Sequence, residues 1–91
     1  MPIAVRITPS KMTRDDYETI MKQLEETGSG DPEGRMFHAG YGDDEVHMFD
    51  VWESHEAYQP YHDNLMNLLQ GAGIDGGIVQ IQTIHNTVGR P

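Results

Sequence analysis

Two spacings of apolar residues organise the chain, one with the period of a strand and one with the period of a helix. Short stretches rich in Val, Ile, Phe and Tyr are bounded by Gly, Pro and Asp, which is typical of strands. The pattern predicts four strands, over residues 3–8, 35–41, 46–53 and 77–85. The second and third strands are close in sequence, so a hairpin is the expected connection between them.

Two longer stretches carry helical stripes of apolar residues. The first helix is expected to begin at Thr13, where Asp16 completes a sequence resembling a capping box, and to end at Gly28. The second has Ser54 as its expected N-cap and reaches about Gly71. Their buried stripes are expected to comprise Tyr17, Ile20, Met21 and Leu24 in the first helix and Tyr58, Tyr61, Leu65, Leu68 and Ala72 in the second.

The order of these elements is strand, helix, strand, strand, helix, strand. With right-handed crossovers it predicts an α+β fold, the ferredoxin-like βαββαβ arrangement of a four-stranded antiparallel sheet with two helices on one face. Residues 1–91 are expected to form this single domain, with 86–91 as a tail. Both faces of the predicted hairpin are apolar and two helices cover only one face, so we expect a second copy of the chain to cover the other.

Charge and composition limit the kinds of partner that we expect for the chain. Fifteen acidic against six basic residues give a net charge of −9, which repels phosphate backbones and anionic membrane surfaces. Neither nucleic acid nor a membrane is therefore an expected partner, and no apolar run approaches the length of a membrane span. The first residues lack the features of a secretion signal and the chain has no Cys, so we expect a cytoplasmic protein without disulfides.

Asp50 stands out because it lies in the middle of an apolar strand, between Met48 and Trp52. An unpaired carboxylate in such a place would be costly. The first and third strands are neighbours in this topology, so Arg6 in the first strand is the expected partner of Asp50. The two residues could form a structural ion pair or line a pocket, and both interpretations can hold at once.

Histidines are candidate acid–base groups because their ordinary pKa lies near neutrality. If the hairpin loop has two or four residues, His38 and His47 share one face of the hairpin and Asp50 lies on the other. His62 follows Pro60, which is expected to kink or restart the second helix, and could point into the cleft between helix and sheet. Each histidine could equally be a core, interface or surface residue. Two histidines fall short of the three ligands that a metal site needs, so no metal is predicted.

Aromatic residues near the end of the third strand are candidates for ligand contact. Trp52, Tyr58 and Tyr61 could form a wall for a planar ligand, or they could simply pack the core. Tyr17, on the first helix, is a further candidate for substrate binding.

The stretch VWESHEAY, residues 51–58, resembles the junction between the third strand and the second helix in the dimeric α/β-barrel superfamily. That superfamily includes the antibiotic-biosynthesis monooxygenase-like proteins, and LLQGAGIDGG, residues 68–77, is also similar to them. The resemblance implies a homodimer in which two sheets close into a barrel, with a pocket between the sheet and helices of each subunit. It also implies a choice among cofactor-independent oxygenases, isomerases, cyclases, haem-degrading enzymes and members without known activity. The haem-degrading members rely on a first-strand Asn and a His late in the second helix, and this chain has neither.

Two hypotheses follow. In the first, a cofactor-independent enzyme of the monooxygenase, isomerase or cyclase type acts on an aromatic or polyketide-like small molecule. In the second, a ligand-binding or accessory protein of the same fold has no turnover. The chain has no nucleotide-binding or flavin-binding motif, so no cofactor is expected. The catalytic candidates are His62, His38 and Asp50, and the substrate-binding candidates are Arg6, Trp52, Tyr58 and Tyr17.

Overall fold

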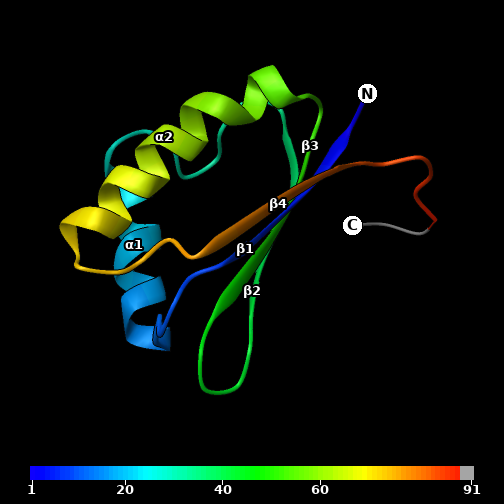
Figure 1. Cartoon of the computed structure of the whole chain (residues 1–91). Coiled ribbons are helices and arrows are strands. Elements are labelled where there is room, and N and C mark those ends of the chain that lie inside the picture. Colours follow the sequence, from blue (N-terminus) through cyan, green and yellow to red (C-terminus); the bar gives the residue numbers. More distant parts are fainter. Residues whose placement is uncertain (89–91) are drawn as a thin grey trace.

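A computed structural model describes residues 1–88 and confirms the βαββαβ order. The elements are β1 (Ile3–Thr8), α1 (Arg14–Glu26), β2 (Arg35–Tyr41), β3 (His47–Trp52), α2 (His55–Gly71) and β4 (Ile78–Thr83). The strands form one antiparallel sheet in the order β2-β3-β1-β4, and both helices lie on the same face of it (Figure 1). The chain therefore has the ferredoxin-like fold that the pattern predicts. Of the expected tail, 86–88 have no regular structure and 89–91 lie outside the described residues.

The helix starts are confirmed in detail. The Thr13 hydroxyl accepts a hydrogen bond from the Asp16 N–H, and the Asp16 carboxylate accepts one from the Thr13 N–H, both at 3.1 Å. At the second helix, the Ser54 hydroxyl accepts from the Ala57 N–H at 3.1 Å. These bonds satisfy N–H groups that the first turn of a helix leaves without partners. Within residues 1–88, no helix combines the length and apolar composition needed to cross a membrane.

Two details of α2 differ from the prediction. The helix continues through Pro60, so it is not restarted there. Pro60 is exposed and is the sixth residue of the helix, where it removes one backbone hydrogen bond, to the Glu56 carbonyl, without ending the helix. The buried stripe ends on Leu69, while Leu68 is half-buried and Ala72 is exposed. The helix therefore turns Leu69, rather than Leu68, toward the sheet.

The core lies between the helices and one face of the sheet. Strand residues alternate across the sheet, so β1 and β3 each contribute every second side chain to this inner face. The buried apolar residues here include Val5, Ile7, Met48, Trp52, Ile20, Leu24, Tyr58, Tyr61, Leu65 and Leu69. Within residues 1–88, no helix covers the opposite, outer face of the sheet (Figure 1).

The expected register of the β2–β3 hairpin is wrong by one residue. Tyr41 pairs with His47, so the loop holds an odd number of residues, 42–46, rather than two or four. Val46 is drawn out of the hairpin ladder because its N–H donates to the Met12 carbonyl at 2.8 Å. A shift of one residue changes which side chains share a face. His38 therefore lies directly opposite Asp50 on the inner face, and His47 lies with Tyr41 on the outer face.

A β-bulge interrupts β2 near its start. Arg35 pairs with Trp52 and Phe37 pairs with Val51, so Met36 is an extra residue without an opposite partner. In an uninterrupted strand, residues with an odd spacing such as Arg35 and His38 would lie on opposite faces. The extra residue brings both to the inner face, which is a recognised effect of bulges near functional sites.

Candidate functional site

Asp50 is the centre of a buried hydrogen-bonded cluster on the inner face of the sheet. It is 1% exposed. One carboxylate oxygen lies 2.5 Å from His38 Nδ1, and the other accepts from Trp52 Nε1 at 3.1 Å. The three residues come from adjacent positions of β2 and β3, so the sheet itself sets their geometry. The expectation that this carboxylate needs a partner is confirmed, but the partners are His38 and Trp52.

The pairing of Asp50 with Arg6 is wrong. Arg6 lies opposite Phe49 in the β1–β3 ladder, and its exposed side chain is on the outer face. Asp50 lies opposite Val5, which faces the core. The two strands are neighbours as expected, but alternation along each strand separates the charges by the thickness of the sheet.

Tyr17 extends the cluster from α1. Its hydroxyl lies 2.7 Å from His38 Nε2, and the two rings are almost parallel, with an interplanar angle of 6°. Because Nδ1 faces a carboxylate, it carries the proton in neutral His38, and Nε2 is then the acceptor. The Tyr17 O–H therefore donates to Nε2. This is the arrangement of a base whose tautomer a buried carboxylate holds.

Gly40 makes room for Tyr17. A Cβ atom at this position would lie 2.4 Å from Cζ of Tyr17 and 2.5 Å from its hydroxyl. Any side chain at Gly40 would displace the tyrosine ring from His38. The glycine is thus a requirement of the site rather than of the strand, where glycine is otherwise unfavourable.

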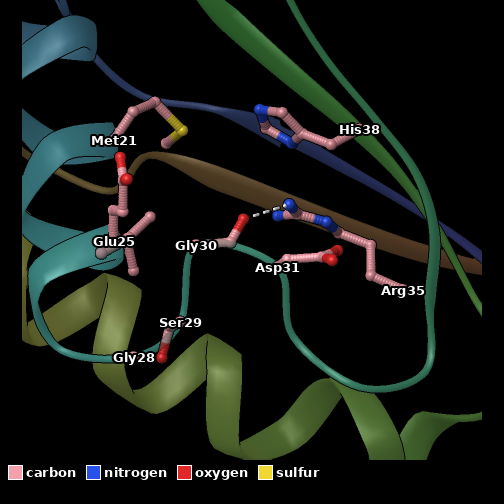
Figure 2. A pocket seen from close by; sticks show the side chains of 9 residues that line it. Met21, Glu25, Gly28, Ser29, Gly30, Asp31, Arg35 and His38 are labelled. Carbon is pink, nitrogen blue, oxygen red and sulfur yellow. Dashed lines mark hydrogen bonds between the residues drawn. The ribbon is translucent and has the colours of Figure 1, made fainter.

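An open cleft of about 590 Å³ lies beside this cluster. Its walls are α1, the loop that follows α1, and the start of β2 (Figure 2). Met21 and Leu24 supply apolar surface, His38 and Arg35 project from β2, and Glu25 and Asp31 supply carboxylates. His38 has a side-chain exposure of 14% and links the buried cluster to the cleft.

Hydrogen bonds to α1, α2 and β2 hold the loop that follows α1 in place. Its Ser29 N–H donates to the Leu24 carbonyl at 2.7 Å, and its hydroxyl accepts from Asn64 of α2 at 3.1 Å. The Arg35 guanidinium crosses the cleft and donates to the Gly30 carbonyl at 2.8 Å, the dashed line of Figure 2. The same guanidinium lies over the Tyr61 ring, 5.5 Å from its centroid. The cleft is therefore shaped before any ligand enters it.

Arg35 is the cleft residue that the sequence pattern did not indicate. Its position at the start of an expected strand carried no chemical signal, and only the bulge places it on the inner face. The one local hint was Gly34, directly before Arg35, because a glycine often marks an irregularity in a strand.

His62 and Tyr58 form a separate polar pair. The Tyr58 hydroxyl and His62 Nδ1 are 2.7 Å apart on one face of α2, and neither residue lines the cleft. Trp52 and Tyr58 are fully buried and pack with ring centroids 5.5 Å apart. The structure thus joins Tyr17, His38, Asp50 and Trp52 into one cluster and leaves His62, Tyr58 and Arg6 outside the cleft.

Three tyrosines near Asp50 hold their protons more tightly than usual. Burial, followed by the Asp50 charge, raises the pKa of Tyr17, while Arg35 lowers it. Burial is also the main reason why the pKa values of Tyr58 and Tyr61 lie well above the ordinary 10, with Asp50 adding to it. The Tyr61 hydroxyl is buried and, among residues 1–88, has no hydrogen-bond partner. At neutral pH these hydroxyls are therefore donors rather than anions.

Metal binding finds no support in the described part of the chain. No group of three or more His, Asp or Glu side chains there is arranged to hold a metal ion. His38 and His47, the two strand histidines, face opposite sides of the sheet. Both ring nitrogens of His38 are already hydrogen-bonded.

The chain shares its ferredoxin-like fold with several solved structures. No family model matches the sequence, and no curated protein sequence does. Similar solved structures include a Chloroflexus aurantiacus protein provisionally assigned as an antibiotic biosynthesis monooxygenase, at TM-score 0.67 and 13% identity over 100% of both chains.

Two further structures have the same fold. One is a variant of SnoaB, a cofactor-independent oxygenase from Streptomyces nogalater, at TM-score 0.63 and 12% identity over 96% of this chain and 94% of that one. The other is a Nitrosomonas europaea protein of unknown function, at TM-score 0.58 and 10% identity over 99% of this chain and 91% of that one. At these sequence identities the similarity shows the fold alone, so any statement about chemistry must rest on the site residues of this chain.

Proposed function

We propose that this protein is a cofactor-independent enzyme that removes a proton from an aromatic or polyketide-like small molecule bound in the cleft. The observation that carries the proposal is the hydrogen-bonded chain from Asp50 through His38 to a hydroxyl at Nε2. A general base needs a fixed tautomer and an accepting nitrogen that a proton donor can reach. The geometry supports both for His38, because Asp50 lies at Nδ1 and a hydroxyl already lies at Nε2. The enzymes named among the structural neighbours, an oxygenase and an assigned monooxygenase, are consistent with small-molecule chemistry.

The proposed step is a single proton transfer. The Tyr17 hydroxyl occupies the position from which a substrate proton would reach Nε2. A substrate X–H group replaces the Tyr17 hydroxyl, its proton moves to Nε2, and both bonding electrons stay on the substrate. His38 becomes an imidazolium beside the Asp50 carboxylate, and the substrate becomes an anion, so charge and atoms balance. Isomerisation, cyclisation and oxygenation can all start from such an anion, so all three reaction types are compatible with this step.

Hydrogen–deuterium exchange at the α-carbon of 2-tetralone tests this step. This probe is an aromatic ketone with an acidic C–H group, and proton NMR in D2O follows the loss of its α-hydrogen signal. The protein is expected to accelerate exchange, and H38A should lose about 10²–10⁴-fold of that acceleration, as is usual when a general base is removed. H55A, which changes an exposed histidine at the start of α2, should exchange at the wild-type rate.

The same assay separates the enzyme from a ligand-binding or accessory protein without turnover. Trp52 and Tyr58 are completely buried, so these rings pack the core and do not contact a ligand, and this favours the binding or accessory protein. A protein that binds 2-tetralone but leaves its exchange rate at the rate in buffer would be a binding protein. Equal exchange by wild type and H38A would remove His38 from the chemistry.

We further propose that the working form is a homodimer built on the outer face of the sheet. Phe37 and Phe49 pack edge to face there, 6.3 Å between centroids, and Tyr41 beside them is 44% exposed. Arg6, Ala39, Tyr41 and Phe49 line a shallow hollow on this face. An apolar sheet face of this kind is stabilised when a second copy covers it.

Analytical ultracentrifugation checks the dimer. The wild-type chain should sediment as a dimer at micromolar concentration, and F49E, which places a carboxylate in the apolar face, should weaken dimerisation by about 100-fold or more. T19E adds the same charge at an exposed position of α1 and should remain dimeric. A wild-type monomer at micromolar concentration would contradict the proposal.

A further inference from the structure

Arg35 has an uncommon environment for an arginine in so acidic a chain. The Gly30 carbonyl is the one hydrogen-bond acceptor that its guanidinium finds within residues 1–88. No carboxylate in that range lies within 4.0 Å of it, although the chain has 15 acidic residues. A guanidinium has five N–H donors, so most of them point at the cleft or at solvent without a protein acceptor. Such a group is available to an oxygen of a ligand.

The remaining charges of the cleft restrict what that ligand is. Glu25 and Asp31 line the cleft as well and are exposed to solvent, where water screens them. Together with the net charge of −9, they disfavour the entry of a molecule that is already an anion. Arg35 lies deeper, half-buried over the Tyr61 ring, so its field is screened less than that of the exposed carboxylates. This arrangement suits a ligand that enters neutral and becomes negative inside the cleft.

Arg35 and His38 reach the cleft from the same strand and the same face, because of the bulge at Met36. One is a cation with free donors, and the other is a base whose proton-accepting nitrogen already meets a hydroxyl. The charge of Arg35 also reaches this hydroxyl, since it lowers the pKa of Tyr17 against the effect of burial. The negative charge that a proton transfer to His38 leaves on a ligand in the cleft would therefore lie within the field of Arg35.

We infer that Arg35 is the oxyanion-stabilising residue of the cleft, and that the substrate is a neutral phenol or enolisable ketone whose oxygen becomes negative on deprotonation. The inference rests on the proposed function, because the proposed proton transfer to His38 creates that negative charge. The arginine named as a substrate-binding candidate from the sequence was Arg6, which lies on the opposite face of the sheet. The binding energy of Arg35 is greater for the anion than for the neutral substrate, which is the condition for catalysis rather than for tight substrate binding.

4-Nitrophenol is a suitable probe because it titrates near neutral pH and changes colour when it ionises. Absorbance titrations across that range give the dissociation constants of the phenol and the phenolate separately. An opposite charge within a few ångströms lowers an acid's pKa by about one unit or more, so wild type should bind the phenolate at least about 10-fold more tightly than the phenol. R35M should bind both forms with similar affinity, and R35K should retain part of the preference.

Two variants control this experiment. K22M removes a cation from an exposed position of α1 that does not line the cleft, and it should keep the wild-type preference. H38A should also keep it, because the probe can lose its proton to water, so failure of the base and failure of Arg35 are distinguished. If R35M does not fold, R35Q, whose amide can still donate to Gly30, replaces it. No binding of the probe, no preference in wild type, or a wild-type preference in R35M (or in R35Q where it replaces R35M) would each overturn the inference.

Discussion

The D50N variant should fold and yet lose most of its proton-transfer activity. An asparagine side chain can accept from Trp52 Nε1 through its oxygen, and its NH2 group then faces His38 Nδ1. Nδ1 must become the acceptor, so the proton of neutral His38 moves to Nε2, the nitrogen that should receive the substrate proton. Loss of the correct tautomer in Ser-His-Asp triads costs about 10⁴-fold, and we expect about 10³–10⁴-fold here in the 2-tetralone exchange rate.

Nitrogen-15 NMR of the His38 ring provides a second readout that a loss of stability would not produce. Wild type should show the Nδ1–H tautomer and D50N the Nε2–H tautomer. The free energy of unfolding of D50N should fall by about 1.5–3 kcal/mol, the usual contribution of hydrogen bonds to a charged group. D50A should lose more stability, because it leaves the N–H groups of both His38 and Trp52 without a buried acceptor. An exchange rate within about threefold of wild type in folded D50N would exclude Asp50 from orienting the base.

Stability should fall steeply in alkali, because the folded chain keeps Tyr58 and Tyr61 protonated. Both side chains are buried, and their pKa values lie above the ordinary 10 of the unfolded chain. Below pH 10 both states hold these protons, so stability does not depend on them. Above pH 10 the unfolded state binds fewer protons, and each tyrosine lowers the free energy of unfolding by about 1.4 kcal/mol per pH unit. Urea unfolding between about pH 8 and pH 11 measures the combined slope.

Two phenylalanine variants assign the slope to particular hydroxyls. Y61F removes a buried hydroxyl without a partner among residues 1–88, so at neutral pH its stability should equal or exceed that of wild type by up to about 1 kcal/mol. Y58F loses the hydrogen bond to His62 Nδ1 and should be less stable than wild type by about 1 kcal/mol. Each variant should lose its own share of the alkaline slope, about 1.4 kcal/mol per pH unit, and Tyr17, whose pKa is also raised, should contribute to the slope that remains. An undiminished slope in both would show that other groups cause the alkaline unfolding.

The fold was predictable because its signals are local. The helix stripes, the Thr13 and Ser54 caps and the strand alternation each depend on residues within one element. They agree with the structure except at the end of the α2 stripe, where Leu69 is buried rather than Leu68 and Ala72. The hairpin register failed because it depends on the loop, where a backbone bond from Val46 to Met12 removes one residue from the strand. No pattern within the hairpin reports that contact.

The candidate site was predictable in part for the same reason. Asp50 could be found because a carboxylate in an apolar strand conflicts with its surroundings, whatever its partner is. Its partner could not be predicted, because strand register and alternation decide whether His38 or Arg6 lies on the same face as Asp50. The bond from Tyr17 to His38 joins residues of a helix and a strand that no short-range pattern connects.

The bulge at Met36 makes the face of Arg35 depend on how the strand is paired and not only on the residue itself. If Met36 were paired in the ladder, opposite Trp52, regular alternation would carry the Arg35 side chain to the outer face, while His38 stayed opposite Asp50. Deleting Met36 would remove the bulge but would leave Arg35 and His38 two positions apart, on the same inner face. In related chains, an arginine at an odd spacing from the base therefore reaches the cleft only where a bulge intervenes, and one at an even spacing reaches it only where the strand is regular. Spacing and pairing must be compared together, because an alignment that counts residues alone would assign this cation to the wrong face of the sheet.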